Sequence, residues 1–254
     1  MRRASTCLAL LGLAVLGLPA AASAAPTVTL VAKAVPIKGF PGTGNIYGAG
    51  AAVEAHFTIK GTEGIGGVPS PLTHVNFYLP YGAKVHAGGF VTCPPATLEN
   101  VGPKGCPKKS QASPLGSANV AQKIGAETVR EPATIQAFFA PGGGLQFYTN
   151  AEAPISAQLI ASTGHYINSR KPYGPELDSE VRLITTLPEA PPVSTESINL
   201  VVGAAYKQGK KTVYYGTVPK KGQCPKGGFP LKSEMTFQTG ETVTNTYKAP
   251  CPKK

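Results

Sequence analysis

Histidines and carboxylates are the residues of this chain that could carry acid–base chemistry. The chain has four histidines and twelve glutamates, but Asp178 is its single aspartate. An enzyme with paired carboxylates would therefore depend mainly on glutamates, and no G-x-S-x-G motif indicates a serine nucleophile. A secreted hydrolase acting on glycans or esters is the alternative prediction, and it requires several such side chains in one concave pocket. The candidates are His56, His74, His86, His165, Glu54, Glu127, Glu152, Glu176, Asp178 and Glu180.

One short acidic run suggests a metal site. Glu176, Asp178 and Glu180 occupy alternate positions, and alternate residues of a strand lie on the same face. The three carboxylates could converge on a cation, although the run lacks the glycine and the distal glutamate of a calcium-binding loop. The other interpretation is a solvated turn that leads into the next strand. We expect no resident metal and no cofactor.

Four cysteines, each followed by proline, form the clearest motif of the chain: Cys93, Cys106, Cys224 and Cys251. A residue before proline favours extended backbone, so these cysteines belong to rigid segments. No C-x2-C or H-x3-H spacing supports a zinc site. An even number of cysteines in an exported chain indicates disulfides. Three pairings are possible, and the favoured one joins Cys93 to Cys106 and Cys224 to Cys251 because each of these pairs is local in sequence.

The first 24 residues have the pattern of a signal peptide. Arg2 and Arg3 form a basic start, Leu8–Leu18 is apolar, and Ala22–Ala24 supplies the small residues that precede cleavage. No later apolar run approaches the ~20 residues of a membrane-spanning helix. The sequence therefore predicts an exported protein, secreted or held in the cell envelope, with no transmembrane segment after cleavage.

The positive charge is concentrated near the C-terminus. The formal net charge is +11, yet residues 25–206 contribute only +1 and Lys207–Lys254 contribute +8. Such a segment could bind anionic cell-wall polymers or other envelope components, and no specific nucleic acid is expected. A solvated surface that protects edge strands is the competing interpretation. The candidate polyanion-binding residues are Lys207, Lys210, Lys211, Lys220, Lys221 and Lys226.

The elements that must position these residues are predicted to be mainly strands. With 30 glycines and 25 prolines in 254 residues, long helices are disfavoured. Ser117–Val129 is the one helical candidate of the predicted mature chain, and Gly125 weakens it. Apolar and polar residues alternate with the period of two that is typical of half-buried strands. The expected strands are Thr27–Val35, Val53–Lys60, Val75–Leu79, Thr134–Phe139, Leu145–Thr149, Ala157–Ala161, Glu180–Thr186, Ser197–Val202, Thr212–Val218, Glu234–Gln238 and Thr242–Tyr247.

Many short strands separated by turn signals predict an antiparallel, immunoglobulin-like sandwich, either one extended unit or two small ones. Residues 25–190 would form the main region. Residues 191–254 would form a basic C-terminal β region, which could belong to the same domain. The proline pair at 191–192 is the most plausible break.

The cysteine segments also resemble a known family. The motifs are Phe90–Cys93, Gly102–Pro107 with Leu115–Ala118, and Cys224–Pro230 with Tyr247–Pro252. They are similar to those of an uncharacterised family of secreted actinobacterial β-rich proteins with paired Cys-Pro motifs. The resemblance supports the local disulfide pairing and implies no activity. We therefore predict an exported, non-catalytic binding or structural module, with the hydrolase as the alternative.

Overall fold

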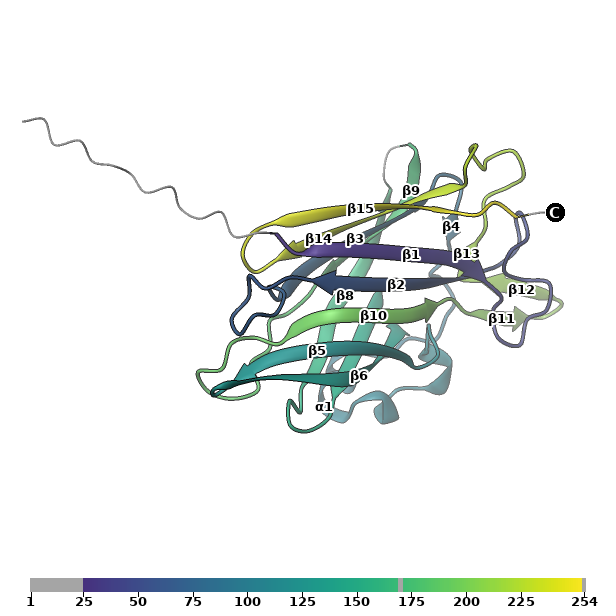
Figure 1. Ribbon diagram of the computed structural model, residues 1–254. Helices are drawn as coiled ribbons and strands as arrows, with labels where there is room; N and C mark the ends of the chain where they lie inside the picture. Colours follow the sequence, from purple (N-terminus) through teal and green to yellow (C-terminus); the bar gives the residue numbers. More distant parts are fainter. Residues whose placement is uncertain (1–24, 169–170, 253–254) are drawn as a thin grey trace, which may run out of the picture.

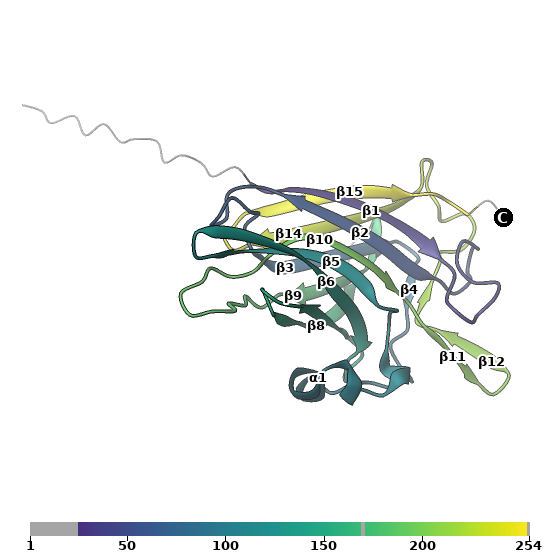
Figure 2. The same ribbon diagram turned by 60° about the horizontal axis from the view of Figure 1, so that its bottom comes forward.

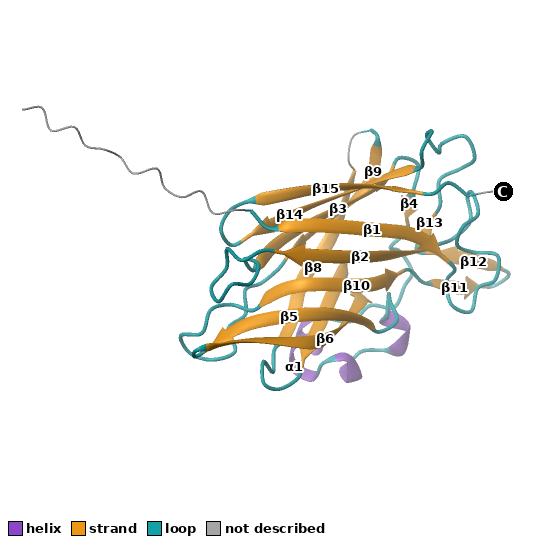
Figure 3. Cartoon of the chain, in the orientation of Figure 1, coloured by secondary structure: helices purple, strands orange, loops and turns teal. Residues whose placement is uncertain are grey.

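The computed structural model describes residues 25–168 and 171–252, and the predicted signal peptide lies outside these ranges (Figure 1). Strands dominate the chain, and its short helices are confined to one region (Figure 3). The helices are α1 (Pro95–Val101) and the short 3-10 turns η1 (Pro103–Gly105) and η2 (Lys108–Ser110). The strands are β1 (Thr27–Val35), β2 (Ala52–Lys60), β3 (Leu72–Pro80), β4 (Lys84–Val85), β5 (Gly116–Ile124), β6 (Glu127–Phe139), β7 (Leu145–Ala151), β8 (Gln158–Asn168), β9 (Tyr173–Glu180), β10 (Ser194–Val202), β11 (Ala205–Gln208), β12 (Lys211–Tyr214), β13 (Gly216–Thr217), β14 (Phe229–Phe237) and β15 (Thr242–Ala249).

Eleven of these strands form one antiparallel sheet in the order β1-β2-β10-β5-β6-β7-β8-β9-β3-β14-β15. The sheet folds over on itself, so that β1, β2, β10, β5 and β6 lie in front of the remaining strands (Figures 1 and 2). Its two edge strands, β1 and β15, then lie side by side, and Asn245 Nδ2 donates a hydrogen bond to the Val28 carbonyl oxygen at 2.6 Å. The chain is thus mainly β with two facing antiparallel layers.

Alternation in the sequence explains why the predicted strands form. In β1, Val28, Leu30 and Ala32 are buried while their neighbours are exposed, which confirms the predicted bounds of Thr27–Val35. In β14 the same alternation buries Met235 and Phe237. These side chains meet across the layers and fill the core between β1, β2, β3 and β14.

The predicted helix over Ser117–Val129 is wrong. These residues form β5, a turn and the start of β6. Gly125 has a φ of 57° in that turn, a left-handed conformation that glycine adopts readily. Ala118 and Val120 of β5 are buried on the inner face, so cross-strand burial outweighs helix propensity here. The predicted strand Glu180–Thr186 is also displaced, because β9 ends at Glu180.

Both proposed regions of the chain contribute to the same sheet. β10, from the C-terminal region, lies between β2 and β5, and β14 pairs with β3. The proline pair at 191–192 therefore precedes a central strand of the sheet rather than a second sheet. No helix among the described residues is long and apolar enough to span a membrane.

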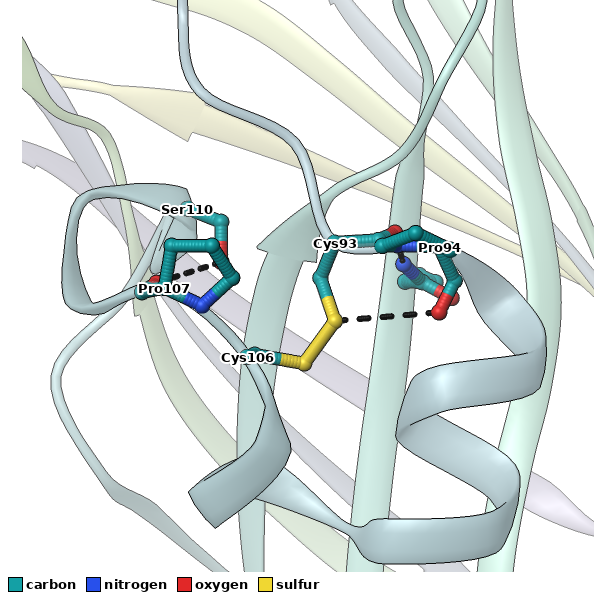
Figure 4. Close-up of a disulfide and its surroundings, with 6 residues drawn as sticks. Cys93, Pro94, Cys106, Pro107 and Ser110 are labelled. Carbon is teal, nitrogen blue, oxygen red and sulfur yellow. Dashed lines mark hydrogen bonds between the residues drawn. A yellow bond between two sulfur atoms is a disulfide. The ribbon is translucent and has the colours of Figure 1, made fainter.

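Two disulfides hold segments that strand pairing does not fix. Cys93 is bonded to Cys106 around α1, and Cys224 is bonded to Cys251, which is the local pairing expected. The first bridge holds the helical segment against the outer face of β6 and β7 (Figure 4). There Leu98 of α1 contributes to a buried cluster with Phe138 and Tyr148.

Candidate functional site: an apolar cavity between the layers

A cavity of about 200 Å³ lies between the two layers of the sheet. Side chains from β2, β3, β5, β6, β7, β9 and β10 line it, together with residues of the segment 181–193. Almost all of them are aliphatic or aromatic. Representative members are Val53, Val75, Phe77, Phe147, Leu177 and Ile198.

The burial pattern shows that this part of the interior is incompletely filled. On β3, Val75, Phe77 and Leu79 face the cavity, yet each is only partly buried, whereas the outward-facing Tyr78 is 7% exposed. In a filled protein interior, inward apolar side chains lose nearly all contact with solvent. Met235, on the neighbouring strand β14, meets that expectation with 0% exposure. The cavity is therefore a local feature and not a property of the whole core.

The cavity is long and narrow. Along β10 its lining extends from Thr195 to Val202, which is about 23 Å at ~3.3 Å per residue. A volume of about 200 Å³ spread over such a length leaves a thin channel. Phe57 and Phe77 meet edge-to-face across the layers, with ring centroids 6.0 Å apart, and mark its border with the filled core.

Polar side chains in the lining are few. They include Thr149, Ser179 and Thr195, and Arg182 is the one charged residue in the part of the lining that the structure describes. Arg182 is exposed at one end of the cavity, where its Nη1 lies 3.3 Å from Glu99 Oε1. The cavity thus reaches the surface beside the segment 181–193.

A second, smaller cavity of about 70 Å³ adjoins the first at the opposite end. The two share Ala51, Val53, Leu79 and Gly216 in their linings. Its charged lining residues are Lys33 and Lys84. The Lys33 side chain itself lies on the outer face of β1, where its ammonium group pairs with Glu54.

The predicted acid–base residues lie outside both cavities. On the outer face of the sheet, His74 Nε2 lies 3.2 Å from Asp178 Oδ1. Asn76 Nδ2 donates to Glu176 Oε1 at 2.6 Å and lies 3.4 Å from Asp178 Oδ2. The Asn76 amide thus lies between the carboxylates of Glu176 and Asp178. Among the described residues, no group of three or more histidine, cysteine, aspartate or glutamate side chains is arranged to hold a metal ion.

A second polar group on this outer face centres on Tyr78. Its hydroxyl donates to Glu234 Oε2 at 2.6 Å, and Lys232 Nζ lies 2.8 Å from Glu234 Oε1 and 3.6 Å from the Tyr78 ring centroid. Burial raises the pKa of Tyr78, and the carboxylates of Glu234 and Glu176 raise it further. Burial also raises the pKa of Glu234, but hydrogen bonds from Lys232 and Tyr78, with the charge of Lys232, outweigh it and lower that pKa overall.

The remaining acid–base candidates are dispersed. Glu54 pairs with Lys33 at 3.2 Å, and His56 and His86 are exposed on separate segments. Glu127 and Glu152 are exposed in different parts of the sheet. His165 stands opposite Asp178 in the register of β8 and β9. The arrangement brings together His74, Glu176 and Asp178 among the candidates, on a sheet face rather than in either cavity.

The six candidate lysines gather at one end of the molecule, which we call the basic end. Lys207, Lys210 and Lys211 lie on the β11–β12 hairpin, and Lys220, Lys221 and Lys226 lie in the segment between β13 and β14. The hairpin projects from the body of the sheet, and the segment between β13 and β14 lies apart from it, beside β14 and β15 (Figures 1 and 2). The small cavity borders the start of this segment, since Val218 and Pro219 contribute to its lining.

No protein-family model, no curated protein and no solved structure matches the chain. The assignment of a function therefore depends on the geometry described above.

Proposed function

We propose that this chain is a non-catalytic binding module that holds an aliphatic chain in the cavity between its layers. The observation that carries the proposal is the incomplete burial of inward apolar side chains such as Phe77 and Leu177 around that cavity. An apolar cavity of about 150 Å³ can already bind a small hydrocarbon, and this one is larger. Its few polar groups are typical of a site that binds an apolar ligand.

The shape of the cavity favours an extended chain over a compact ring system. The lining extends about 23 Å along β10, which matches the length of an extended alkyl chain. A flexible methylene chain can follow the curvature of the layers, and each buried methylene contributes about 0.8 kcal/mol. The hydrolase alternative has less support, because neither cavity has a glutamate, aspartate or histidine in its lining among the residues whose side chains the structure describes.

Displacement of an environment-sensitive fluorescent fatty acid from the purified mature protein tests this proposal. Fatty acids of increasing length should displace the probe with affinities that rise until the channel is full. The variants Ala118→Phe and Ala55→Leu place additional carbon atoms in the cavity, and each should weaken binding by more than about tenfold. Ala126→Phe, on the exposed β5–β6 turn, should bind as the parent protein does.

Thermal unfolding accompanies these binding measurements. Ala118→Phe could destabilise the fold by overpacking, so the milder Ala55→Leu variant keeps the test decisive. A parent protein that binds no fatty acid would contradict the proposal. Unchanged affinity in two folded cavity variants would contradict it as well.

We propose an exported location for the module. The signal-peptide pattern of residues 1–24 supports it, and so do the two disulfides, which are typical of oxidising compartments. The resemblance to secreted actinobacterial proteins with paired Cys-Pro motifs is consistent with this location. The two facing antiparallel layers support an immunoglobulin-like sandwich as a proposal, although the eleven strands are hydrogen-bonded as one sheet.

A second candidate function is docking of the basic end on an anionic surface of the cell envelope. The observation that favours it is that six lysines lie on two projecting segments, the β11–β12 hairpin and the segment before β14. Clustered cations attract polyanions more strongly than dispersed ones because their potentials add. This function is compatible with chain binding, because the cavity and the hairpin are different parts of the molecule.

A further inference from the structure

One segment closes an end of the large cavity. Residues 181–193, which we call the strap, join β9 of one layer to β10 of the other (Figure 2). The strap contains neither helix nor strand, yet Val181, Ile184 and Val193 contribute apolar side chains to the cavity lining. Because the cavity reaches the surface beside the strap, the position of this segment determines whether the cavity is open at that end.

The backbone of the strap is attached to the sheet at its ends. At its start, Val181 N donates to the Thr73 carbonyl oxygen at 2.8 Å, and its last residue leads directly into β10. Val193 N donates to the Ile184 carbonyl oxygen at 2.8 Å, but this bond lies within the strap. Three of the thirteen strap residues are prolines, which have no N–H group to donate. The middle of the strap therefore depends on side chains for its attachment.

Gln122 of β5 provides that attachment. Ala118, Val120 and Gln122 occupy alternate positions and are all buried, and the first two line the cavity. The Gln122 side chain is 0% exposed; its Nε2 donates to the Pro191 carbonyl oxygen at 2.8 Å, and its Oε1 accepts from Thr186 Oγ1 at 2.6 Å. A buried amide is costly unless it is hydrogen-bonded. Both halves of this amide are satisfied by the strap, at the end of the cavity.

The strap also forms an ion pair, which is the weaker of its two side-chain attachments. Arg182 Nη1 lies 3.3 Å from Glu99 Oε1, and the two side chains are 66% and 41% exposed. Exposed ion pairs contribute little, because solvent screens the charges and the long side chains lose freedom. The hydrogen bonds of Gln122 are made by a side chain that is shielded from water. Gln122 is therefore the main attachment of the middle of the strap.

We infer that the strap is a lid through which an aliphatic ligand enters and leaves the large cavity, and that Gln122 holds this lid closed. This inference rests on the proposed chain-binding function. Local opening of a segment requires only the free energy of the contacts that hold it, so release of two hydrogen bonds opens the mouth while the sheet persists. Lids of this kind control the exchange of ligand with solvent. Since the same bonds close the empty and the occupied cavity, their loss changes the rates of binding and release rather than the affinity.

Stopped-flow fluorescence with the environment-sensitive fatty acid measures both rates in the purified mature protein. Gln122→Met keeps the length of the side chain and removes both hydrogen bonds to the strap. It should raise the association and dissociation rates by about tenfold each and change the Kd by less than about threefold. Thr186→Val removes one of the two bonds from the strap side, and it should raise both rates by a smaller factor.

Gln136→Met is the matched control. Gln136 of β6 is also buried, and its Nε2 donates to a carbonyl oxygen at 3.2 Å, but its partner is Ser113, outside the strap. This variant should leave both rates as they are in the parent protein. Hydrogen exchange of the ligand-free protein is the second readout. Strap amides such as that of Val193 should exchange about tenfold faster in Gln122→Met, while amides of β1 should change much less.

The outcomes separate the two proposals. If the parent protein binds no fatty acid, the proposed function fails and the inference fails with it. If the parent binds, and both strap variants bind and release at its rates, the chain-binding function stands and the lid is refuted. Faster release with unchanged association in Gln122→Met would show that Gln122 supports the bound chain directly, which also overturns the inference. Equal acceleration in Gln136→Met would overturn it too, because general destabilisation would then explain the rates.

Discussion

Tyr78 and Glu234 show how single residues on the outer face depend on each other's protonation. The Tyr78 hydroxyl needs its proton to donate to Glu234, and Glu234 must be ionised to accept well from both Tyr78 and Lys232. The pKa of Tyr78 is raised and that of Glu234 is lowered. Each shift extends the pH range over which this hydrogen-bonded arrangement persists.

These pKa shifts of Tyr78 and Glu234 predict a contribution to folding stability that is lost in acid and in alkali. A carboxyl with a lowered folded-state pKa stabilises the fold above its ordinary value of 4.5 and loses that effect as the pH falls through the lowered value. A phenol with a raised pKa stabilises the fold below its ordinary value of 10.0 and loses the effect as the pH rises further. The contribution is therefore fully present between about pH 5 and pH 9.

The variant Glu234→Gln should lower the free energy of unfolding by about 1–2 kcal/mol at pH 7, because it replaces two hydrogen bonds to a charged group. At pH 3 the difference from the parent protein should narrow, since the Glu234 carboxyl of the unfolded parent chain is then mostly protonated and folding must release that proton. Urea unfolding at the two pH values measures both quantities. Glu127→Gln, on an exposed turn, should differ from the parent by less than about 0.5 kcal/mol. A Glu234→Gln deficit that is independent of pH would contradict the assignment.

At the scale of the elements, the helical segment between Cys93 and Cys106 covers the outer face of β6 and β7. Its Leu98 is fully buried against the outer face of β6 and β7, where Phe138 is also fully buried. Gln146 of β7 lies beneath the same cover, and its Nε2 donates to the Cys93 carbonyl oxygen at 2.5 Å. The disulfide thus closes a layer that protects these strands from solvent on the side away from the cavity.

Replacing both members of one disulfide should destabilise the protein by about 3 kcal/mol, because the unfolded chain regains the freedom of a closed loop. The loop lengths of 13 and 27 residues differ too little to separate the two bridges on this basis. Cys93→Ser with Cys106→Ser should in addition expose the α1 cover to proteolysis. Cys224→Ser with Cys251→Ser should leave α1 protected. Equal protease sensitivity of the α1 segment in both double variants would refute the covering role.

Elements with strict alternation were predictable from the sequence, and elements that depend on distant partners were not. Thr27–Val35 was predicted with its observed bounds because every second residue is apolar and buried. Ser117–Val129 was misassigned because its alanine, glutamine and lysine residues have helical propensity, while pairing with β6 and β10 decides its structure. The short α1 helix was missed, since seven residues held by a disulfide show no helical periodicity.

At the scale of the whole molecule, the cavity was not predictable from the sequence. Alternation shows that Phe77 and Leu177 face inward, but it gives no information on whether the opposite layer fills the space between them. Whether the space is filled depends on the distance between the two layers. The layers belong to one sheet of eleven strands, whose edge strands β1 and β15 lie side by side. The concentration of lysines near the C-terminus was visible in the sequence, while the projection of the β11–β12 hairpin from the sheet was not.

The distribution of charge over the molecule leads to a prediction for the basic end. The protein should bind vesicles that contain anionic lipid, and raising the ionic strength should weaken that binding because salt screens exposed charges. Each lysine near an anionic surface contributes about 1 kcal/mol, so Lys207→Gln with Lys210→Gln and Lys211→Gln should reduce binding about a hundredfold. The control variant Lys60→Gln with Lys104→Gln and Lys109→Gln removes equal charge from exposed positions away from the hairpin. Co-sedimentation across a salt series measures both variants. Equal losses in the two would show that net charge alone determines binding and that the hairpin has no special role.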